Sequence, residues 1–350
     1  MKLLIINPGA TSTKIAVFND ETEILKTNIE HPAQELAQFN RIIDQKEYRL
    51  RLILDWLKCA GCAVADFNAV VGRGGLLRHI PSGTYEVTER VIADVMDPPY
   101  GEHASNLGVV LAKEIADMAG VKAYFVDPVS VDELTDVARV SGYCGMQRES
   151  FFHALNQKSM ARKAAELLGK PYNEVNLIVV HMGGGVSVAA HKRGLVVDMF
   201  NVKDEGSFAM DRGGSLPVNA VINMCFSGLT KSEVKKKLGS EAGVFSYLGT
   251  RDFREVERRA HLGEADAKLI FDALAYQHAK DIGAMAAVLR YDVDAVVFTG
   301  GIANSTALCD AITGYIGKLG RIICLPGEEE MRSLAQGGLR VLHGEAASVY

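Results

Sequence analysis

Short runs of aliphatic, β-branched and aromatic residues alternate with amphipathic segments along this chain. Residues 3–7 (LLIIN) and 14–18 (KIAVF) are two such runs with a turn of small and hydroxyl residues between them, which predicts a β-hairpin. Residues 49–61 (RLRLILDWLKCAG) have apolar side chains at helical spacing and predict an amphipathic helix. Strands that alternate with helices in this way are typical of an α/β protein.

The same arrangement returns at half the chain length, which indicates an internal repeat. Residues 177–200 contain a strand, a glycine turn, a strand, a second turn and a strand, as residues 3–30 do. Each half then has an apolar run that ends in glycines, AVVGRGG at 69–75 and AVVFTGG at 295–301, and each run is typical of a buried parallel strand. This order predicts two related α/β domains whose glycine turns face a shared cleft, where phosphate would bind.

The turn of the first hairpin has the composition of an anion site but not the spacing of a P-loop. Thr13 stands where a P-loop has its second glycine, Ile15 stands where it has the magnesium-binding hydroxyl, and no helical pattern follows. Backbone N–H groups at such a turn, with Gly9 and the hydroxyls of Thr11 and Ser12, can hold phosphate. An ordinary surface hairpin is the alternative that this turn alone leaves open.

Composition and charge narrow the class of protein. A chain of 350 residues is long enough for two domains, and its 48% apolar and 23% charged residues are ordinary for a globular protein. The net charge of -5 argues against binding nucleic acid through a basic surface. Because no run of about 18 apolar residues is present, we expect a cytoplasmic protein with no membrane partner.

The six cysteines are too sparse for a disulfide scaffold of this length. Cys59 and Cys62 form a C-x-x-C pair, which can bind zinc or do redox work, but no second pair completes a set of four ligands. Packing at the end of the predicted helix is the interpretation that we favour.

Several motifs, in this order and at this spacing, resemble those of the short-chain acyl kinases, the acetokinase family, and most closely its butyrate-kinase branch. The resemblance covers essentially the whole chain. Its most specific stretches are NPGATSTKIAVF, GRGGLLRHIPSGTYEV, EHASNLG, VDPVSVDE, HMGGGVSVAAH, FAMDRGGSLP, FTGGIANS and PGEEEMRSLAQGGLRVLHGE.

The resemblance implies two duplicated ribonuclease H-like domains, as in the actin-like ATPases, around a central nucleotide cleft. Residues 1–150 would form the domain on the side of the acyl substrate, and residues 151–326 the nucleotide-binding domain. The C-terminal segment 327–350, a predicted amphipathic helix after a Pro-Gly turn, would return to the first domain. The family also implies ATP or ADP and Mg²⁺ as cofactors, a short-chain carboxylic acid as substrate and a homo-oligomer.

Two arginines stand where an acid substrate needs positive charge, because its carboxylate is ionised at neutral pH and repels the γ-phosphate. Arg73 follows the run AVVG, and Arg212 lies in MDRGGS beside Gly213 and Gly214, which permit a close approach to its guanidinium. Both match the catalytic arginines of acyl kinases. A surface salt bridge is the alternative for each.

Three further polar residues follow apolar strands. Asp127 follows AYFV and precedes Pro128, and the family implies a role through Mg²⁺ or in orienting the transfer; a helix N-cap is the alternative. His181 matches the histidine that donates to the transferring phosphoryl group in acetate kinases. His181 holds the same place in the second half as Asn7 does in the first. Asn7 is similar to the family's asparagine near the metal and phosphates. The resemblance therefore implies a metal site that consists of Asn7 and Asp127.

Substrate and phosphate contacts are expected mainly from the two glycine turns. Lys14 can pair with phosphate or simply be a solvated strand lysine, and His103 in EHASN matches a substrate-side histidine. The full expected set is Asn7, Gly9, Thr11, Ser12, Lys14, His103, Gly183, Gly184 and Gly185.

Nucleotide contacts are expected from the second half of the chain. Gly300, Gly301 and Asn304 follow an apolar strand, where glycine lets adenosine lie against the backbone. Asp252, Phe253 and Arg254 lie in TRDFREVE, which is similar to the acyl-kinase stretch that borders adenine. Charge on a surface helix is the alternative reading of that stretch.

One departure from the acetate-kinase pattern concerns the metal. The acetate-kinase motif G-I-G-E-N-S has a glutamate near the metal, whereas GGIANS has Ala303 there. The departure favours the butyrate-kinase branch, and the predicted reaction is the reversible ATP-dependent phosphorylation of butyrate, isobutyrate or another branched acid. Acetate or propionate kinase, a sugar or other hydroxyl kinase, and an actin-like nucleotide-binding assembly protein are the alternatives.

Overall fold

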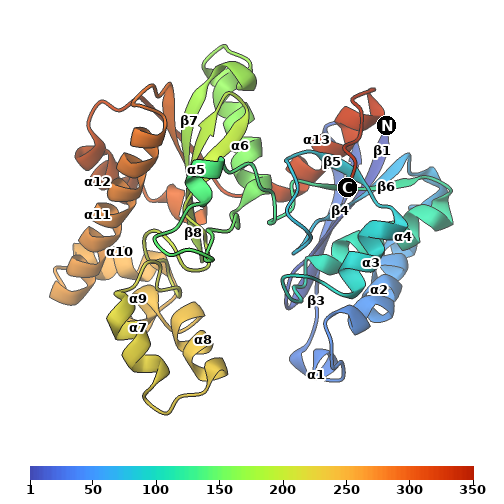
Figure 1. Cartoon of the computed structure of the whole chain (residues 1–350). Helices are drawn as coiled ribbons and strands as arrows, with labels where there is room; N and C mark the ends of the chain where they lie inside the picture. The colour runs from blue at the N-terminus through green and yellow to red at the C-terminus, as the bar shows by residue number, and fades with distance from the viewer. The chain divides into compact units, whose positions relative to one another are not determined.

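The computed structural model describes all residues, Met1–Tyr350, and the chain forms two compact units. The first unit consists of Met1–Asp132 and Glu329–Tyr350, and the second of Glu133–Glu328. Figure 1 shows that a sheet with helices packed on it makes up each unit.

The first unit contains a six-stranded sheet in the order β3-β2-β1-β4-β6-β5. β1 and β2 are joined by the turn that follows Pro8 and pair antiparallel, so the predicted hairpin is confirmed. β1, β4 and β6 run parallel. The strands are β1 (Lys2–Pro8), β2 (Ser12–Asn19), β3 (Thr22–Glu30), β4 (Ala69–Arg73), β5 (Thr84–Glu86) and β6 (Lys122–Val126).

Helices cover both faces of this sheet. α4 packs on the face formed by Leu4 and Val70, whereas α13 packs on the face formed by Leu3 and Val71. The two faces are distinct because neighbouring residues of a strand point in opposite directions. The helices of this unit are α1 (Ala33–Leu36), α2 (Lys46–Cys59), α3 (Glu89–Met96), α4 (Asn106–Ala119) and α13 (Glu330–Leu342).

Close approach of α13 to the sheet depends on Gly337. A methyl group there would come within 2.4 Å of the side chain of Val126. The predicted C-terminal helix therefore lies against β1, β4 and β6 of the first unit, as Figure 1 shows.

The second unit contains a five-stranded sheet in the order β11-β10-β7-β8-β9. α6 packs on β7 and β10, and α11 packs on β7 and β8. Its strands are β7 (Asn176–Met182), β8 (Val186–Lys192), β9 (Leu195–Met199), β10 (Ala295–Gly300) and β11 (Arg321–Pro326). Its helices are α5 (Asp136–Arg139), α6 (Ala154–Leu167), α7 (Val218–Cys225), α8 (Lys231–Gly239), α9 (Gly243–Leu248), α10 (Phe253–His261), α11 (Ala265–Val288) and α12 (Thr306–Ile316).

The internal repeat extends to the register of the sheets. The order β3-β2-β1-β4-β6 in the first unit corresponds to β9-β8-β7-β10-β11 in the second. Leu3 pairs with Ala69 as Leu177 pairs with Ala295, so Asn7 and His181 occupy equivalent places near the ends of their strands.

The sequence predicts a boundary between the domains near residue 150. In the structure the second unit begins earlier, at Glu133. Arg148 pairs with Asp198 at 2.8 Å and with Glu205 at 2.9 Å, and the buried Lys158 pairs with Glu133 at 2.6 Å. These ion pairs hold residues 133–150 on the second unit.

Two other features bear on the class of protein. Cys59 is the last residue of α2 and is exposed, whereas Cys62 is buried. The chain contains no group of three or more His, Cys, Asp or Glu side chains that could hold a metal ion. None of the helices combines the length and the apolar composition that crossing a bilayer requires.

Candidate active site

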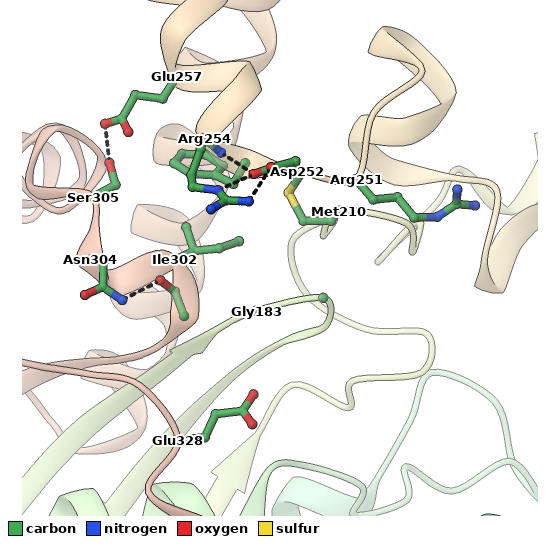
Figure 2. A pocket seen from close by; sticks show the side chains of 13 residues that line it. Gly183, Met210, Arg251, Asp252, Arg254, Glu257, Ile302, Asn304, Ser305 and Glu328 are labelled. Atoms are coloured by element: carbon green, nitrogen blue, oxygen red, sulfur yellow. Dashed lines mark hydrogen bonds and ion pairs between the residues drawn. The ribbon is translucent and has the colours of Figure 1, made fainter. Parts of the chain in front are cut away.

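A pocket of about 890 Å³ opens in the second unit. Its walls come from the β7–β8 turn, the start of α10, and the short 3₁₀ segment Gly301–Asn304 that follows β10 (Figure 2). The residues that line it are Gly183, Gly184, Met210, Arg251, Asp252, Phe253, Arg254, Glu257, Gly301, Ile302, Asn304, Ser305 and Glu328.

Most residues expected to bind nucleotide lie on this pocket. Asp252, Phe253 and Arg254 form one wall, and Gly301 and Asn304 form another. The structure thus brings together two segments that are about fifty positions apart in the sequence.

Gly300 differs from the other expected nucleotide residues, because it does not line the pocket. Its φ is 84°, and a methyl group there would come within 2.3 Å of the carbonyl oxygen of Met182. Gly300 therefore lets the end of β10 pack closely against the end of β7.

Asp252 and Arg254 hold each other in place at the start of α10. The Asp252 carboxylate accepts a hydrogen bond from the Arg254 backbone N–H at 3.0 Å, which caps the helix, and others from Nε at 2.9 Å and Nη2 at 2.6 Å (Figure 2). Hydrogen bonding to Arg254 lowers the pKa of Asp252. Phe253 is buried beside Phe271, with ring centroids 6.1 Å apart.

Four polar residues of the pocket, Arg251, Glu257, Ser305 and Glu328, were not singled out from the sequence. The Ser305 hydroxyl donates to Glu257 Oε1 at 2.6 Å and accepts from the Leu308 N–H at 3.1 Å, so it also caps α12 (Figure 2). A serine just before an apolar helical run is a recognisable N-cap signal, but nothing local in the sequence connects it with Glu257.

Arg212 lies against the glycine turn of the second unit. A methyl group on Gly185 would come within 2.7 Å of Arg212 Nη1, so only glycine leaves room for the guanidinium. Nη1 also donates to the carbonyl oxygen of Val202 at 3.3 Å. Gly183 and Gly184 line the pocket on the same turn, so the expected phosphate turn and Arg212 are neighbours.

His181 is buried at the end of β7, and its Nδ1 lies 2.7 Å from Asn156 Oδ1. The Asn156 amide nitrogen donates to the carbonyl oxygens of Gly327 at 3.3 Å and Glu328 at 3.0 Å, which turns its oxygen toward the imidazole. An amide oxygen only accepts, so Nδ1 of His181 carries a proton. Its Nε2 lies 3.9 Å from Glu328 Oε1.

A second histidine lies on His181. The rings of His153 and His181 stack with centroids 3.8 Å apart and an interplanar angle of 11°. His153 Nδ1 lies 2.9 Å from the Ser187 hydroxyl, which links the pair to β8. Neither His153 nor Asn156 was identified from the sequence, because their proximity to His181 depends on how α6 packs on β7.

In the first unit, the ends of β1, β4 and β6 bring together Asn7, Arg73 and Asp127. β4 lies between the other two strands, with Ile6 paired to Gly72 and Arg73 paired to Val126. Asn7 Oδ1 accepts a hydrogen bond from Arg73 Nη1 at 3.3 Å.

Glu330, the first residue of α13, completes this cluster and was missed from the sequence. Its Oε1 forms an ion pair with Arg73 Nη1, and its Oε2 accepts a hydrogen bond from Asn7 Nδ2 at 2.7 Å. A single carboxylate thus bridges the guanidinium and the amide.

Asp127 is buried, with a φ of 37° that is uncommon for a residue with a side chain. Its Oδ1 accepts the Gly83 N–H at 2.7 Å, and its own N–H donates to the Gly83 carbonyl at 3.1 Å. No helix begins at Asp127, so the N-cap alternative is wrong.

The remaining expected residues lie on the first turn, at the start of β2 and on the loop before α4. In the first turn, Gly9 N–H donates to the Ser12 carbonyl at 2.7 Å, Thr11 is exposed, and Lys14 lies on β2 directly opposite Asn7. His103 lies before α4, where its Nδ1 accepts the Ser105 N–H at 3.2 Å.

Comparisons with known proteins agree with this architecture. A model of the Acetokinase family matches residues 142–337. Butyrate kinase 1 of Clostridium acetobutylicum is 48% identical over 346 residues, which cover 98% of either chain.

Two solved structures show the same fold at lower identity. Acetate kinase of Porphyromonas gingivalis superposes with a TM-score of 0.80 at 22% identity, over 97% of this chain and 99% of the other. A propionate kinase of Francisella tularensis superposes with a TM-score of 0.78 at 17% identity, over 96% of this chain and 98% of the other. With this fold and a full-length relative at 48% identity, the chain belongs to the acetokinase family.

Proposed function

We propose that this protein transfers the γ-phosphoryl group of ATP to the carboxylate of a short-chain fatty acid, butyrate or isobutyrate, and runs in reverse to make ATP from the acyl phosphate. The observation that carries the proposal is the similarity to butyrate kinase 1 along the entire chain. The pocket and the cluster at the ends of β1, β4 and β6 supply groups suited to each substrate.

The nucleotide would bind in the pocket of the second unit. Gly301 leaves open space for adenosine, since no atom lies within 4 Å of a methyl group placed there, and Asn304, Asp252, Phe253 and Arg254 would border it. The Gly183 N–H closes the turn by donating to the Gly185 carbonyl at 3.0 Å, and the Gly184 N–H at its tip suits a phosphate oxygen. Gly300 would support the site through packing rather than contact.

The acid would bind at Arg73. The contacts of Arg73 and Asn7 with the Glu330 carboxylate support this role, because both side chains present donors that suit a carboxylate. His103 would border the same substrate. The first turn, with Gly9, Thr11 and Ser12, and Lys14 beside it would stabilise the phosphoryl charge.

Arg212 and His181 would stabilise the transferring group from the second unit. Phosphoryl transfer depends on positioning and on neutralising charge, and Arg212 on its glycine turn provides a fixed cation. Nδ1 of His181 donates to Asn156, so Nε2 is the atom that would face the phosphoryl group, and it would donate there in the doubly protonated imidazolium form.

Magnesium would neutralise the charge on the phosphates, and side chains of the first unit would hold it through hard oxygen ligands. We assign them to Asn7 and Asp127 as expected from the sequence, and add Glu330, whose carboxylate adjoins Asn7. Ala303 is buried and offers no ligand. Few protein ligands are needed, because Mg²⁺ in such sites keeps several waters and is held largely by phosphate oxygens.

A hydroxamate assay with ATP, Mg²⁺ and straight and branched acids of two to six carbons tests the proposal. We expect the highest kcat/KM with butyrate or isobutyrate, and overlapping activity on neighbours because one methylene contributes only about 1–3 kcal/mol. A preference for acetate or propionate would change the substrate, and no product from any acid would refute the function. The proposal includes a cytoplasmic location and a homo-oligomer of two or more chains.

A further inference from the structure

Arg49 is a buried cation beneath the β1–β2 turn, and the proposed reaction assigns it no role. It lies on α2 with only 1% of its surface exposed. Lysine and arginine side chains are almost never fully buried unless a partner of opposite charge is present. The partners of Arg49 are therefore informative.

Every group that Arg49 contacts is neutral. Nη1 donates to the carbonyl oxygens of Gly9 at 2.9 Å and Ser12 at 3.1 Å, and to the Thr13 hydroxyl at 3.0 Å. Nη2 donates to the carbonyl oxygen of Ala10 at 3.2 Å. Gln45, one helical turn earlier, accepts from Nε at 3.1 Å and from Nη2 at 2.8 Å. The positive charge thus has no carboxylate beside it.

The guanidinium stays charged at neutral pH despite this environment. Burial lowers the pKa of Arg49 to about 10. It also contributes, after burial, to lowering the pKa of the neighbouring His31 to about 4, so that His31 is neutral. His31 Nε2 lies 2.8 Å from the Thr13 hydroxyl and completes an uncharged shell around the cation.

The hydrogen bonds from Arg49 also fix which way the turn faces. In a trans peptide the C=O and the next N–H point in opposite directions. Because the carbonyls of Gly9 and Ala10 point at Arg49, the N–H groups of Ala10 and Thr11 point away from it, and neither has an acceptor within the chain. Ala10 and Thr11 are exposed at the tip of the turn.

We propose that Arg49 is a positioning residue that prepares the first turn to bind the phosphoryl group being transferred. It turns the Ala10 and Thr11 N–H groups outward as a pair of donors. It also places an uncompensated positive charge behind them. The inference rests on the proposed function, since it identifies the anion with the γ-phosphoryl group of ATP. The bound anion supplies the negative charge that no side chain of the protein places beside Arg49. Arg49 does not touch the substrate in this arrangement.

Three variants of the whole 350-residue chain test this role. Arg49→Gln removes the charge, Arg49→Lys keeps the charge but lacks the planar set of donors, and Arg51→Gln is the control, since Arg51 is an exposed arginine on the same helix. For each we would measure thermal unfolding, Kd for ATP and for ADP with Mg²⁺ in the absence of acid, and kcat and KM for the acid.

We expect Arg49→Gln to weaken ATP binding about tenfold or more, while ADP binding changes less than about twofold. We also expect it to lower kcat about 10²- to 10³-fold, as removal of an oxyanion donor does. Arg49→Lys should fall between this variant and the control. A change in the ratio of the two Kd values is decisive, because a merely structural role would weaken both nucleotides together. An unchanged ratio, or a kcat in Arg49→Gln or Arg49→Lys equal to that of Arg51→Gln, would overturn the inference.

Two complications are covered by the design. If Arg49→Gln does not fold, Arg49→Lys provides the test, and a normal Kd ratio in that folded variant overturns the inference. If the unsubstituted protein phosphorylates no acid, the proposed function fails, whereas a shifted Kd ratio would still support the role of Arg49 in binding the phosphoryl group.

Discussion

Glu330 on α13 forms an ion pair with Arg73 at the end of β4 and also accepts a hydrogen bond from Asn7. Only a small part of the Glu330 side chain, 12%, is exposed, so the pair is held in a largely enclosed position. These contacts join α13 to the carboxyl ends of β1 and β4, where the acid is proposed to bind.

Arg73→Gln should weaken the enzyme toward its acid and not toward its nucleotide. Loss of a charge-assisted contact to the carboxylate should lower kcat/KM for butyrate about 10²-fold, while KM for ATP stays within about threefold. Arg332→Gln, an exposed position of α13, is the matched control. Steady-state kinetics with each substrate varied in turn would decide, and an equal loss toward both substrates would argue against a specific role in binding the acid.

Arg212→Ala should abolish turnover while ATP binding survives. An arginine that stabilises the transferring phosphoryl group supplies about 10³ to 10⁵ in rate in related chemistry. The measurements are kcat by hydroxamate formation and Kd for ATP by calorimetry. Near-normal turnover in this variant would show that Arg212 is not catalytic.

Gly301→Ala and Gly300→Ala should differ in kind, although they are neighbours. The methyl group of Gly301→Ala meets no protein atom and extends into space beside the pocket, so KM for ATP should rise about tenfold with unchanged stability. Gly300→Ala meets the Met182 carbonyl at 2.3 Å and needs a φ of 84°, which should cost about 2–4 kcal/mol of folding free energy. Urea unfolding and ATP kinetics separate the two, and identical effects would contradict the assignment.

Stability should fall between pH 6.5 and pH 4 because of His278. Burial lowers the pKa of this histidine, which bonds to the Leu274 carbonyl at 2.6 Å, from 6.5 to about 4. A depressed histidine pKa means that the unfolded chain binds the proton first, so this contribution is complete above pH 6.5 and is lost as the pH falls toward 4. The shift corresponds to about 3 kcal/mol.

The control for this pH effect is His278→Gln, which removes the titrating group. Asp281 has the opposite dependence, since burial raises its pKa to about 6 and its contribution is lost as the pH rises through that value. Comparing the pH slopes of the unfolding free energy in the two proteins isolates His278, because Asp281 is common to both. Equal slopes below pH 6.5 would contradict the prediction.

Local patterns in the sequence were sufficient to predict the hairpins, the repeat and the two segments that line the pocket of the second unit. Strand periodicity and glycine turns are encoded by neighbouring residues, so the β1–β2 and β7–β8 hairpins could be identified directly. Asp252 and Asn304 were found through motifs rather than through their proximity in space.

The residues missed from the sequence are those whose partners are far away along the chain. Asn7 and Glu330 are 323 positions apart, and Arg49 reaches Gly9 over 40 positions. Neither Arg49 nor Glu330 stands out locally, because an arginine on an amphipathic helix and a glutamate in an acidic segment are ordinary surface residues. Only the packing of α2 and α13 on the first sheet gives them neighbours that suggest a role.

The matched register of β1 with β4 and of β7 with β10 limits where the two halves can differ. A slip of one residue would turn every buried side chain of a strand to the opposite face, so the ends of the ladder are where the two halves can differ without disturbing the core. The hairpin tips are such places: the first has hydroxyls and a proline, and the second has consecutive glycines. The two halves thus share one strand register and differ at the tips of their hairpins, where a change of residue leaves the ladder intact.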